Sequence, residues 1–316
     1  MIKLLSNSAH VHVLLNHVPT VGFGLALALF VVGLLRRHDG LTRTALAIFF
    51  IVANIAIATY VSGNGAEAIL QGRPDVSAAA VRAHEDAALF AFTFMEITGF
   101  FSWLALWQWR RVARLPAWNI PLVLTLSILT FALMANAANL GGEIRHEEIR
   151  SVPAASAADD ATPGIAKSLG LFVSGESWVW PACEAIHFVG LCLLFSVVLI
   201  VDLRMLGMIK SVSFAAVFQL LPLGMLGFGL NLITGMMFFI GNPAQYIHNA
   251  TFFWKILFVL LGGFNVLYFT MDDEPWRVGT GDEAPMTAKV AAASAMFIWA
   301  AVLFCGHMLP FLGNAF

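Results

Sequence analysis

Eight apolar stretches constrain this chain more than any other feature of its sequence. They cover residues 12–35, 43–63, 85–108, 117–138, 178–201, 213–240, 250–270 and 288–312. A helix of about 20 apolar residues crosses the hydrocarbon core of a bilayer, where every backbone polar group must be paired within the chain. We therefore expect an all-α polytopic membrane protein with eight transmembrane helices in two four-helix bundles.

The composition excludes several other classes of protein. Apolar residues make up 59% of the chain and charged residues only 11%, against about 25% charged residues in soluble domains. The net charge of −2 provides no basic surface for nucleic acid, so the expected surroundings are the lipid bilayer. Cys183, Cys192 and Cys305 form neither CxxC nor CxxCH, which excludes a covalent c-type haem.

The polar segment between the fourth and fifth stretches predicts the domain boundaries. Residues 151–168 are rich in Ala, Ser and Pro, a composition typical of linkers. We expect an N-terminal bundle over 1–150, a periplasmic linker over 151–177 and a C-terminal bundle over 178–316. The two halves are weakly similar, because the first span of each has a histidine early and an arginine late. Either an internal repeat or independent convergence accounts for this similarity.

The distribution of Lys and Arg predicts the orientation. Most of them fall in loops on one side, namely Arg36, Arg37, Arg43, Arg110, Arg111, Arg114, Arg204, Lys210, Arg277 and Lys289. Loops rich in Lys and Arg stay in the cytoplasm. We therefore expect a multi-pass protein of the bacterial inner (cytoplasmic) membrane with both termini in the periplasm.

The histidines are the strongest functional signal. Of nine histidines, all but His38 fall in the outer half of the predicted bundles or in the outer loops: His10, His12, His17, His84, His146, His187, His248 and His307. Ionisable groups inside a membrane are costly and usually functional. Neutral imidazole is also the usual ligand of haem iron, copper and zinc, although a single membrane histidine can equally form an interhelical hydrogen bond.

Pairs of these histidines are candidates for haem iron ligands. Helices one and three of an up-down bundle face each other across its core, so His17 and His84 are the expected axial ligands of one non-covalent haem b. In the second half, His187 pairs with His248, and His307 is an alternative partner. His12 and His146 are candidate ligands of a second, more exposed haem. The expected number of haems is therefore one to three.

Three ionisable residues within the predicted spans also have candidate roles. Glu96 is expected to be neutral and hydrogen-bonded, or part of a proton path. Glu184 precedes His187 by one helical turn, and either orients its imidazole or reaches outward. Lys255 either extends its ammonium to the membrane surface or pairs with a haem propionate.

The first half of the chain resembles an uncharacterised bacterial four-helix membrane family that opens with His-x4-His-Phe-Pro. The matching stretches are HVLLNHVP at 12–19, SGNGAEA at 62–68, AHEDA at 83–87 and LGGE at 140–143, followed by His146. Val18 stands where the family usually has Phe. This resemblance covers residues 10–150 and implies that His12, His17, His84 and His146 form a functional set.

The second half is similar to another bacterial membrane family of unknown function. The matching stretches are PACEAIH at 181–187, DLRMLG at 202–207 and NATFFWK at 249–255. His248 and His307 are not motif positions of this family. The resemblance covers residues 178–275.

These observations predict a membrane cytochrome b-like electron-transfer subunit with haem near the periplasmic face. Its expected partners are a periplasmic dehydrogenase or cytochrome c and a larger membrane complex. Quinone is a further candidate cofactor. Two alternatives remain open. One is a structural anchor or transporter subunit of a membrane complex. The other is a copper- or zinc-handling membrane protein, with Met95, Met134, Met236 and Met237 as possible soft ligands.

Overall fold

The structure, a computed structural model, describes residues 7–71, 73, 76–112, 116–146, 163–309 and 311. Within these ranges the chain is helical and contains no strand. Eight helical runs are long and apolar enough to cross a membrane. The predicted fold class, an all-α polytopic membrane protein, is therefore confirmed.

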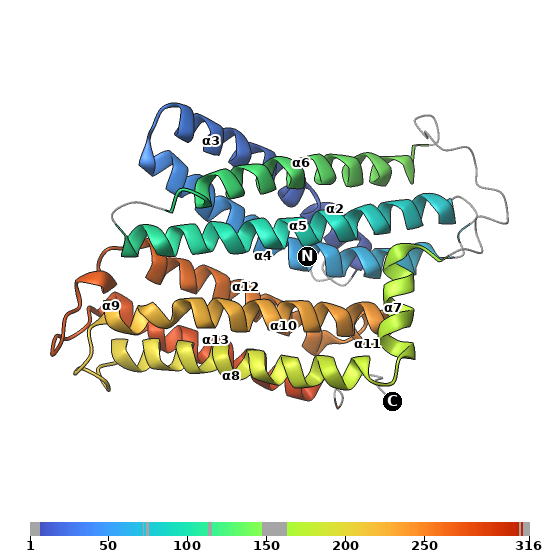
Figure 1. Cartoon of the computed structure of the whole chain (residues 1–316). Helices are drawn as coiled ribbons and strands as arrows, with labels where there is room; N and C mark the ends of the chain where they lie inside the picture. Colours follow the sequence, from blue (N-terminus) through green and yellow to red (C-terminus); the bar gives the residue numbers. More distant parts are fainter. Residues whose placement is uncertain are drawn as a thin grey trace. The chain divides into compact units, whose positions relative to one another are not determined.

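The chain forms two compact units, unit 1 (Met1–Leu171) and unit 2 (Phe172–Phe316). Unit 1 contains α2 (Ser8–Leu15), the π-turn η1 (Val18–Gly22), α3 (Phe23–Leu35), α4 (Asp39–Leu70), α5 (Ala78–Arg111) and α6 (Asn119–Glu143). Its long helices run alongside one another in alternating directions (Figure 1). Helix α4 packs against α2, α3 and α5, while α6 packs against α5 and also contacts α3.

The first span of unit 1 is interrupted where proline enters it. Pro19 lies at the start of η1, and a proline inside a helix removes one hydrogen-bond donor and crowds the preceding turn. The hydroxyl of Thr20 donates to the carbonyl oxygen of Asn16 at 2.8 Å, which compensates in part for the altered backbone pattern. The span therefore consists of α2 and α3 joined by η1, and it begins at Ser8, four residues before the predicted start at residue 12.

Close packing holds the helices of unit 1 together. A Cβ atom at Gly99 would lie 2.4 Å from the Cβ of Ala53, so α4 and α5 approach too closely there for any larger residue. The hydroxyls of Thr98 and Thr130 lie 2.8 Å apart and join α5 to α6. Small residues and interhelical hydrogen bonds are the usual means of association in lipid, where burial of apolar surface gives little advantage.

Helix α7 (Ile165–Gly175) occupies part of the segment predicted to be a linker. Ala166, Gly170 and Val173 are buried, and their spacing of four and three residues places them on one helical face. The carboxylate of Asp86 accepts the backbone N–H of Ala166 at 2.9 Å and so caps the start of α7. Residues 147–162, which include the rest of the predicted linker before Pro163, lie outside the described residues.

Unit 2 is built from four long helices and several short ones. The long helices are α8 (Val179–Met205), α10 (Leu221–Gly241), α12 (Ala250–Met271) and α13 (Met286–Met308), and the short ones are α9 (Phe214–Val217), η4 (Phe218–Leu220), α11 (Pro243–Ile247) and η5 (Pro275–Arg277). Helix α8 packs against both α10 and α13, and α12 packs against α13. A Cβ at Gly227 would lie 2.7 Å from the carbonyl oxygen of Gly190, which is why α8 and α10 meet at two glycines.

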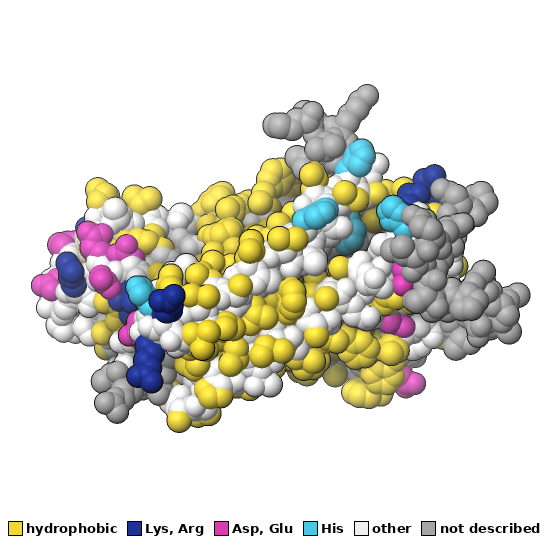
Figure 2. Space-filling model, turned by 90° about the horizontal axis from the view of Figure 1, so that it is seen from above, with side chains coloured by type: hydrophobic (Ala, Val, Ile, Leu, Met, Phe, Trp, Pro, Cys, Tyr) yellow, Lys and Arg dark blue, Asp and Glu magenta, His cyan; other side chains and the backbone are white. Residues whose placement is uncertain are grey.

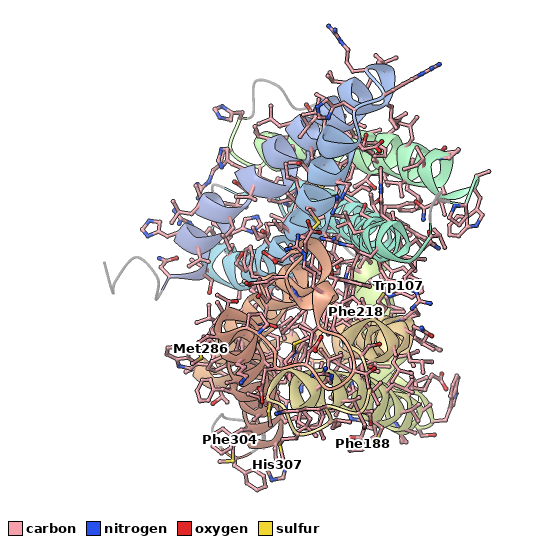
Figure 3. The ribbon with its side chains drawn as sticks, turned by 90° about the vertical axis from the view of Figure 1, so that its left-hand side faces the viewer. Trp107, Phe188, Phe218, Met286, Phe304 and His307 are labelled. Carbon is pink, nitrogen blue, oxygen red and sulfur yellow. The ribbon has the colours of Figure 1, made fainter. Side chains whose placement is uncertain are left out.

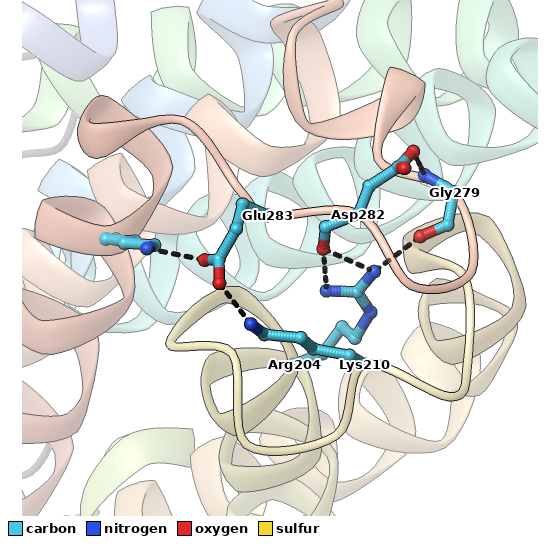
Figure 4. A network of polar contacts seen from close by, with 6 residues as sticks. Arg204, Lys210, Gly279, Asp282 and Glu283 are labelled. Carbon is cyan, nitrogen blue, oxygen red and sulfur yellow. Dashed lines mark hydrogen bonds and ion pairs between the residues drawn. The ribbon is translucent and has the colours of Figure 1, made fainter.

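A buried arginine joins two loops at one end of unit 2 (Figure 4). Arg204 is fully buried. Its Nε donates to the carbonyl oxygen of Val212, one terminal nitrogen donates to that of Gly279 at 2.6 Å, and both terminal nitrogens approach that of Asp282 at 3.4 Å. A guanidinium group has five N–H donors, so one side chain ties the loop after α8 to the loop before α13.

An exposed ion-pair cluster lies beside this buried network. Lys210 and Lys289 both contact the carboxylate of Glu283, the latter at 2.8 Å. The hydrogen bond from Lys210, followed by that from Lys289, lowers the pKa of Glu283 to about 2. The three side chains are partly or largely exposed, so their mutual attraction is screened by solvent.

The outward-facing surface of the spans is apolar. Figure 2 shows apolar side chains along the flank of the molecule and charged side chains toward its ends. Large apolar side chains are exposed in both units, among them Leu25, Phe131, Phe188, Ile233 and Phe297. Such an extensive apolar surface requires lipid or another apolar partner, and together with the eight long helices it indicates a bilayer environment.

Candidate functional site

The described residues bring two histidines together in unit 1. His12 lies on α2, and its Nδ1 is 3.0 Å from the carbonyl oxygen of Thr59 and 3.3 Å from the hydroxyl of Ser62, both on α4. Because a carbonyl oxygen only accepts, Nδ1 carries the hydrogen and donates it. The Nε2 atom of a neutral His12 then keeps its lone pair, as in histidines that bind metals.

His84 on α5 is held in the same way by the following helix. Its Nδ1 donates to the carbonyl oxygen of Ala137 on α6 at 2.9 Å. The Nε2 of His84 therefore also keeps its lone pair when the ring is neutral. Each histidine lies on the first of two consecutive spans and is oriented by a backbone carbonyl of the second.

A glycine lies beside each of these imidazoles. Gly63 follows Thr59 by four residues, and a Cβ at this position would lie 3.1 Å from Cε1 of His12. Gly141 follows Ala137 by four residues, and a Cβ there would lie 3.0 Å from Cε1 of His84. A side chain at either position would press on the ring, so each glycine provides the room in which its imidazole is seated.

The two imidazoles are neighbours. The ring centres of His12 and His84 are 6.4 Å apart, and the ring planes meet at 73°. Two imidazoles on opposite sides of one metal ion, with metal–nitrogen bonds of about 2 Å, have ring centres about 6 Å apart. The observed separation therefore suits two ligands of a single metal ion.

The structure thus corrects the expected pairing in unit 1. His17 is exposed, and its Nδ1 lies 3.1 Å from the carbonyl oxygen of Val13 on its own helix, whereas the ring beside His84 is that of His12. The physical reason is the helical angle: residues five apart point about 140° away from each other, so His12 and His17 cannot both face α5. His146 is exposed beyond the end of α6, and no contact joins it to His12 in the described part of the chain.

In unit 2, His187 is anchored by a hydroxyl group. Its Nδ1 lies 2.8 Å from Oγ1 of Thr234, and that hydroxyl donates its own hydrogen to the carbonyl oxygen of Leu230 at 2.6 Å. Thr234 must therefore accept from His187. Here too, Nδ1 is the donor and Nε2 of the neutral ring is the remaining acceptor.

The two expected partners of His187 lie at exposed positions. His248 follows the short helix α11 and is exposed. His307 is exposed near the end of α13 and packs against Phe311, with ring centres 5.8 Å apart. Figure 3 shows His307 at the periphery near Phe304. Across the described residues, neither contacts His187, so the structure does not form the expected pairs.

Lys255 lies near the start of α12. A Cβ at Gly306 on α13 would come within 3.4 Å of its Nζ, so the ammonium lies beside α13. Tyr246 precedes α12 on the short helix α11, where burial, followed by the carboxylate of Glu184, raises its pKa to about 12. Tyr246 is therefore a neutral phenol at physiological pH.

Metal ligands beyond these histidines are scarce. Among the described residues, no group of three or more His, Cys, Asp or Glu side chains has an arrangement that holds a metal ion. Glu96 on α5 has a buried Oε1 without a hydrogen-bond partner in the same ranges. The donor set of unit 1 therefore consists of two imidazoles.

The comparisons with known proteins give no match. No family model matches the chain, and no curated protein or solved structure matches it either. The two family resemblances inferred from sequence motifs therefore stay predictions, and the function has to be argued from the site alone.

Proposed function

We propose that this protein is a cytochrome b-like electron-transfer protein whose haem iron is held by His12 and His84. The observation that carries the proposal is the pair of neighbouring imidazoles, each fixed through Nδ1 by a carbonyl oxygen of the adjacent helix. Outer hydrogen bonds of this kind orient metal-binding histidines and set which nitrogen faces the metal.

The number of ligands favours haem iron over zinc or copper. Structural and catalytic zinc sites use three or four protein ligands, whereas haem iron receives four nitrogens from the porphyrin and needs only axial ligands from the protein. A donor set of two imidazoles fits haem, and Gly63 and Gly141 leave the two rings room at the site. When bound, haem supplies a one-electron Fe³⁺/Fe²⁺ couple.

The protein residues have distinct tasks in this proposal. His12 and His84 would hold the haem iron through Nε2, while the carbonyl oxygens of Thr59 and Ala137 hold the rings in the required tautomer.

The orientation follows from the two ends of α5. His84 lies near the start of this helix and Arg110 near its end, roughly 39 Å apart at 1.5 Å per residue. Because loops rich in Arg are retained in the cytoplasm, we place the histidine pair near the periplasmic face of the bacterial inner membrane. Electron exchange then takes place with a periplasmic dehydrogenase, a cytochrome c or quinone.

A difference spectrum of the purified protein tests the cofactor and its ligands. The reduced-minus-oxidised spectrum is expected to show b-type bands, and His12→Ala and His84→Ala are each expected to remove the same component. His10→Ala and His17→Ala are matched controls, because both residues are exposed on or next to α2, and both variants should keep that component. Haem-free protein after expression with ample haem, or loss of the component in His17→Ala alone, would refute the proposal.

A vesicle experiment tests the orientation separately. A membrane-impermeant reductant is expected to reduce the haem faster in right-side-out vesicles than in inverted ones. Equal or faster reduction in inverted vesicles would show that the pair lies toward the cytoplasm, even if the ligands are correct.

A further inference from the structure

Arginines gather at the end of unit 1 that lies opposite the histidine pair. They are Arg36 and Arg37 after the end of α3, Arg43 in the second turn of α4, and Arg110 and Arg111 at the end of α5. The stretches 36–43 and 110–112 hold these five arginines and one acidic residue, Asp39. In unit 2, where α8 ends and α13 begins, residues 203–213 and 272–289 hold four basic and five acidic residues. The excess of positive charge therefore belongs to unit 1.

The packing of α4 on α5 brings arginines of both helices to the same level. The rings of Phe50 and Trp103 have centres 5.1 Å apart, and the two helices run in opposite directions (Figure 1). Arg43 lies seven residues before Phe50, and Arg110 lies seven residues after Trp103. Both are therefore about 10 Å from this contact along the bundle, at 1.5 Å per residue.

The turn between α3 and α4 reaches the same end. A Cβ at Gly33 would lie 2.9 Å from the backbone nitrogen of Thr42, so α3 and α4 meet one turn before Arg36 and Arg37. Both arginines are exposed. Neither guanidinium forms a hydrogen bond or ion pair with a residue that the structure describes.

Arg37 has a backbone conformation in which glycine is usual. Its φ is 51°, and no other described residue except glycine has a positive φ. The N–H of Arg37 donates to the carbonyl oxygen of Leu34 at 3.1 Å, and that of His38 donates to Gly33 at 2.9 Å. These two bonds form the Schellman ending of a helix, where a Cβ is strained. An arginine at such a position indicates that its side chain has a task beyond the turn.

Exposed apolar side chains lie next to these arginines. Leu35, which is 77% exposed, precedes Arg36, and the exposed Val112 follows Arg111. The forked guanidinium matches the oxygens of a phosphate group, whereas Leu35 and Val112 suit an acyl chain. An occupant that fits both surfaces is amphipathic and anionic, which describes a phospholipid and not a soluble acidic partner.

We propose that this end of unit 1 binds an anionic phospholipid, whose phosphate is held by Arg36 and Arg37 and whose acyl chain lies along Leu35. Arg43 and Arg110 add positive potential, so a head group with net negative charge is favoured over a zwitterionic one, whose own ammonium is repelled. This interaction goes beyond the proposed electron transfer and requires no haem.

Native mass spectrometry of the full-length protein in a neutral detergent tests the proposal. The probe is phosphatidylglycerol, and phosphatidylcholine with the same acyl chains is the comparison lipid. The first phosphatidylglycerol is expected to bind more tightly than the first phosphatidylcholine. Arg37→Gly is expected to weaken phosphatidylglycerol binding by about fivefold, the effect of one arginine near an anionic head group, and to leave phosphatidylcholine binding unchanged.

Arg37→Gly also separates lipid binding from folding. Glycine is the residue that the turn prefers, so the melting temperature should equal or exceed that of the wild type. Arg36→Gln is a second variant that is expected to weaken binding to a similar extent. Asp39→Asn removes the acidic residue and should strengthen binding. Lys210→Gln is the matched control, because it removes one exposed cation in unit 2 and should leave phosphatidylglycerol binding unchanged.

Three results would overturn the proposal. The first is equal affinity of the wild type for the two lipids. The second is unchanged phosphatidylglycerol binding in both Arg37→Gly and Arg36→Gln, or a loss in Lys210→Gln as large as theirs. The third is displacement of phosphatidylglycerol by an equal concentration of inorganic phosphate, which would show that the arginines bind a soluble anion and that the acyl chain contributes nothing.

Discussion

Replacing Arg204 with methionine should remove the guanidinium while keeping most of the apolar stem. The side chain is fully buried and donates to the carbonyl oxygens of Val212, Gly279 and Asp282. Gly279 keeps the N–H of Asp282 as a second donor at 3.3 Å, so two oxygens lose their main partner. At about 1–3 kcal/mol for each orphaned buried acceptor, we expect the free energy of unfolding to fall by about 3 kcal/mol.

Thermal unfolding monitored with a thiol-reactive dye measures this loss. Cys183 and Cys305 are buried in unit 2 and report its unfolding, provided that the exposed Cys192 is replaced by serine in every variant. A loss of about 3 kcal/mol corresponds to a melting temperature lower by roughly 6–12 °C in a unit of this size.

Lys210→Met is the matched control for Arg204→Met. It removes an exposed ion pair with Glu283 in the same loops, and such pairs contribute little to stability because solvent screens them. The reasoning would be refuted if Arg204→Met melted within about 4 °C of the wild type, or no lower than Lys210→Met.

Two further outcomes can be checked with the same preparations. Gly141→Val should displace the imidazole of His84 and deplete the b-type bands, whereas Gly175→Val, at a position with no described atom within 4 Å of an added Cβ, should leave the spectrum unchanged. Glu283 has a pKa lowered to about 2, so its contribution to stability is present above its ordinary pKa and is lost as the pH falls toward 2. The difference in melting temperature between wild type and Glu283→Gln should therefore be larger at about pH 7 than at about pH 3, and a difference that grows on acidification would contradict this assignment.

The spans could be predicted because hydropathy alone determines which segments enter a bilayer. Their ends could not. Helix α4 continues to Leu70, seven residues past the predicted end at residue 63, because the polar stretch after Val61 stays helical while α2 packs on it. A Cβ at Gly65 would lie 2.6 Å from the Cβ of Ser8, so Gly65 is a contact position between α4 and α2. The sequence also did not predict that part of the linker is helical, because the three buried residues of α7 form only a short helical pattern.

The positions of the histidines could be predicted only in part. His84 was expected to face the first span, but the imidazole beside it is that of His12 and not that of His17, because residues five apart on a helix point about 140° away from each other. The carbonyl oxygens of Thr59 and Ala137 leave no trace in a sequence because every residue has one. The signal that the sequence did offer was Gly63 and Gly141. Each lies four residues after the carbonyl in question, and a larger residue there would press on the neighbouring imidazole.

The repeated arrangement of histidine, carbonyl and glycine has a consequence for how the protein is assembled in the membrane. Each imidazole is oriented by the next long helix of the chain, His12 by α4 and His84 by α6. Each pair of consecutive spans therefore fixes its own imidazole as soon as its second span is inserted, and the first pair does so before α6 has been synthesised. Under the proposed function, docking of the two pairs then brings the haem ligands together. A chain truncated before α6 would hold His12 in place but leave His84 without its orienting carbonyl.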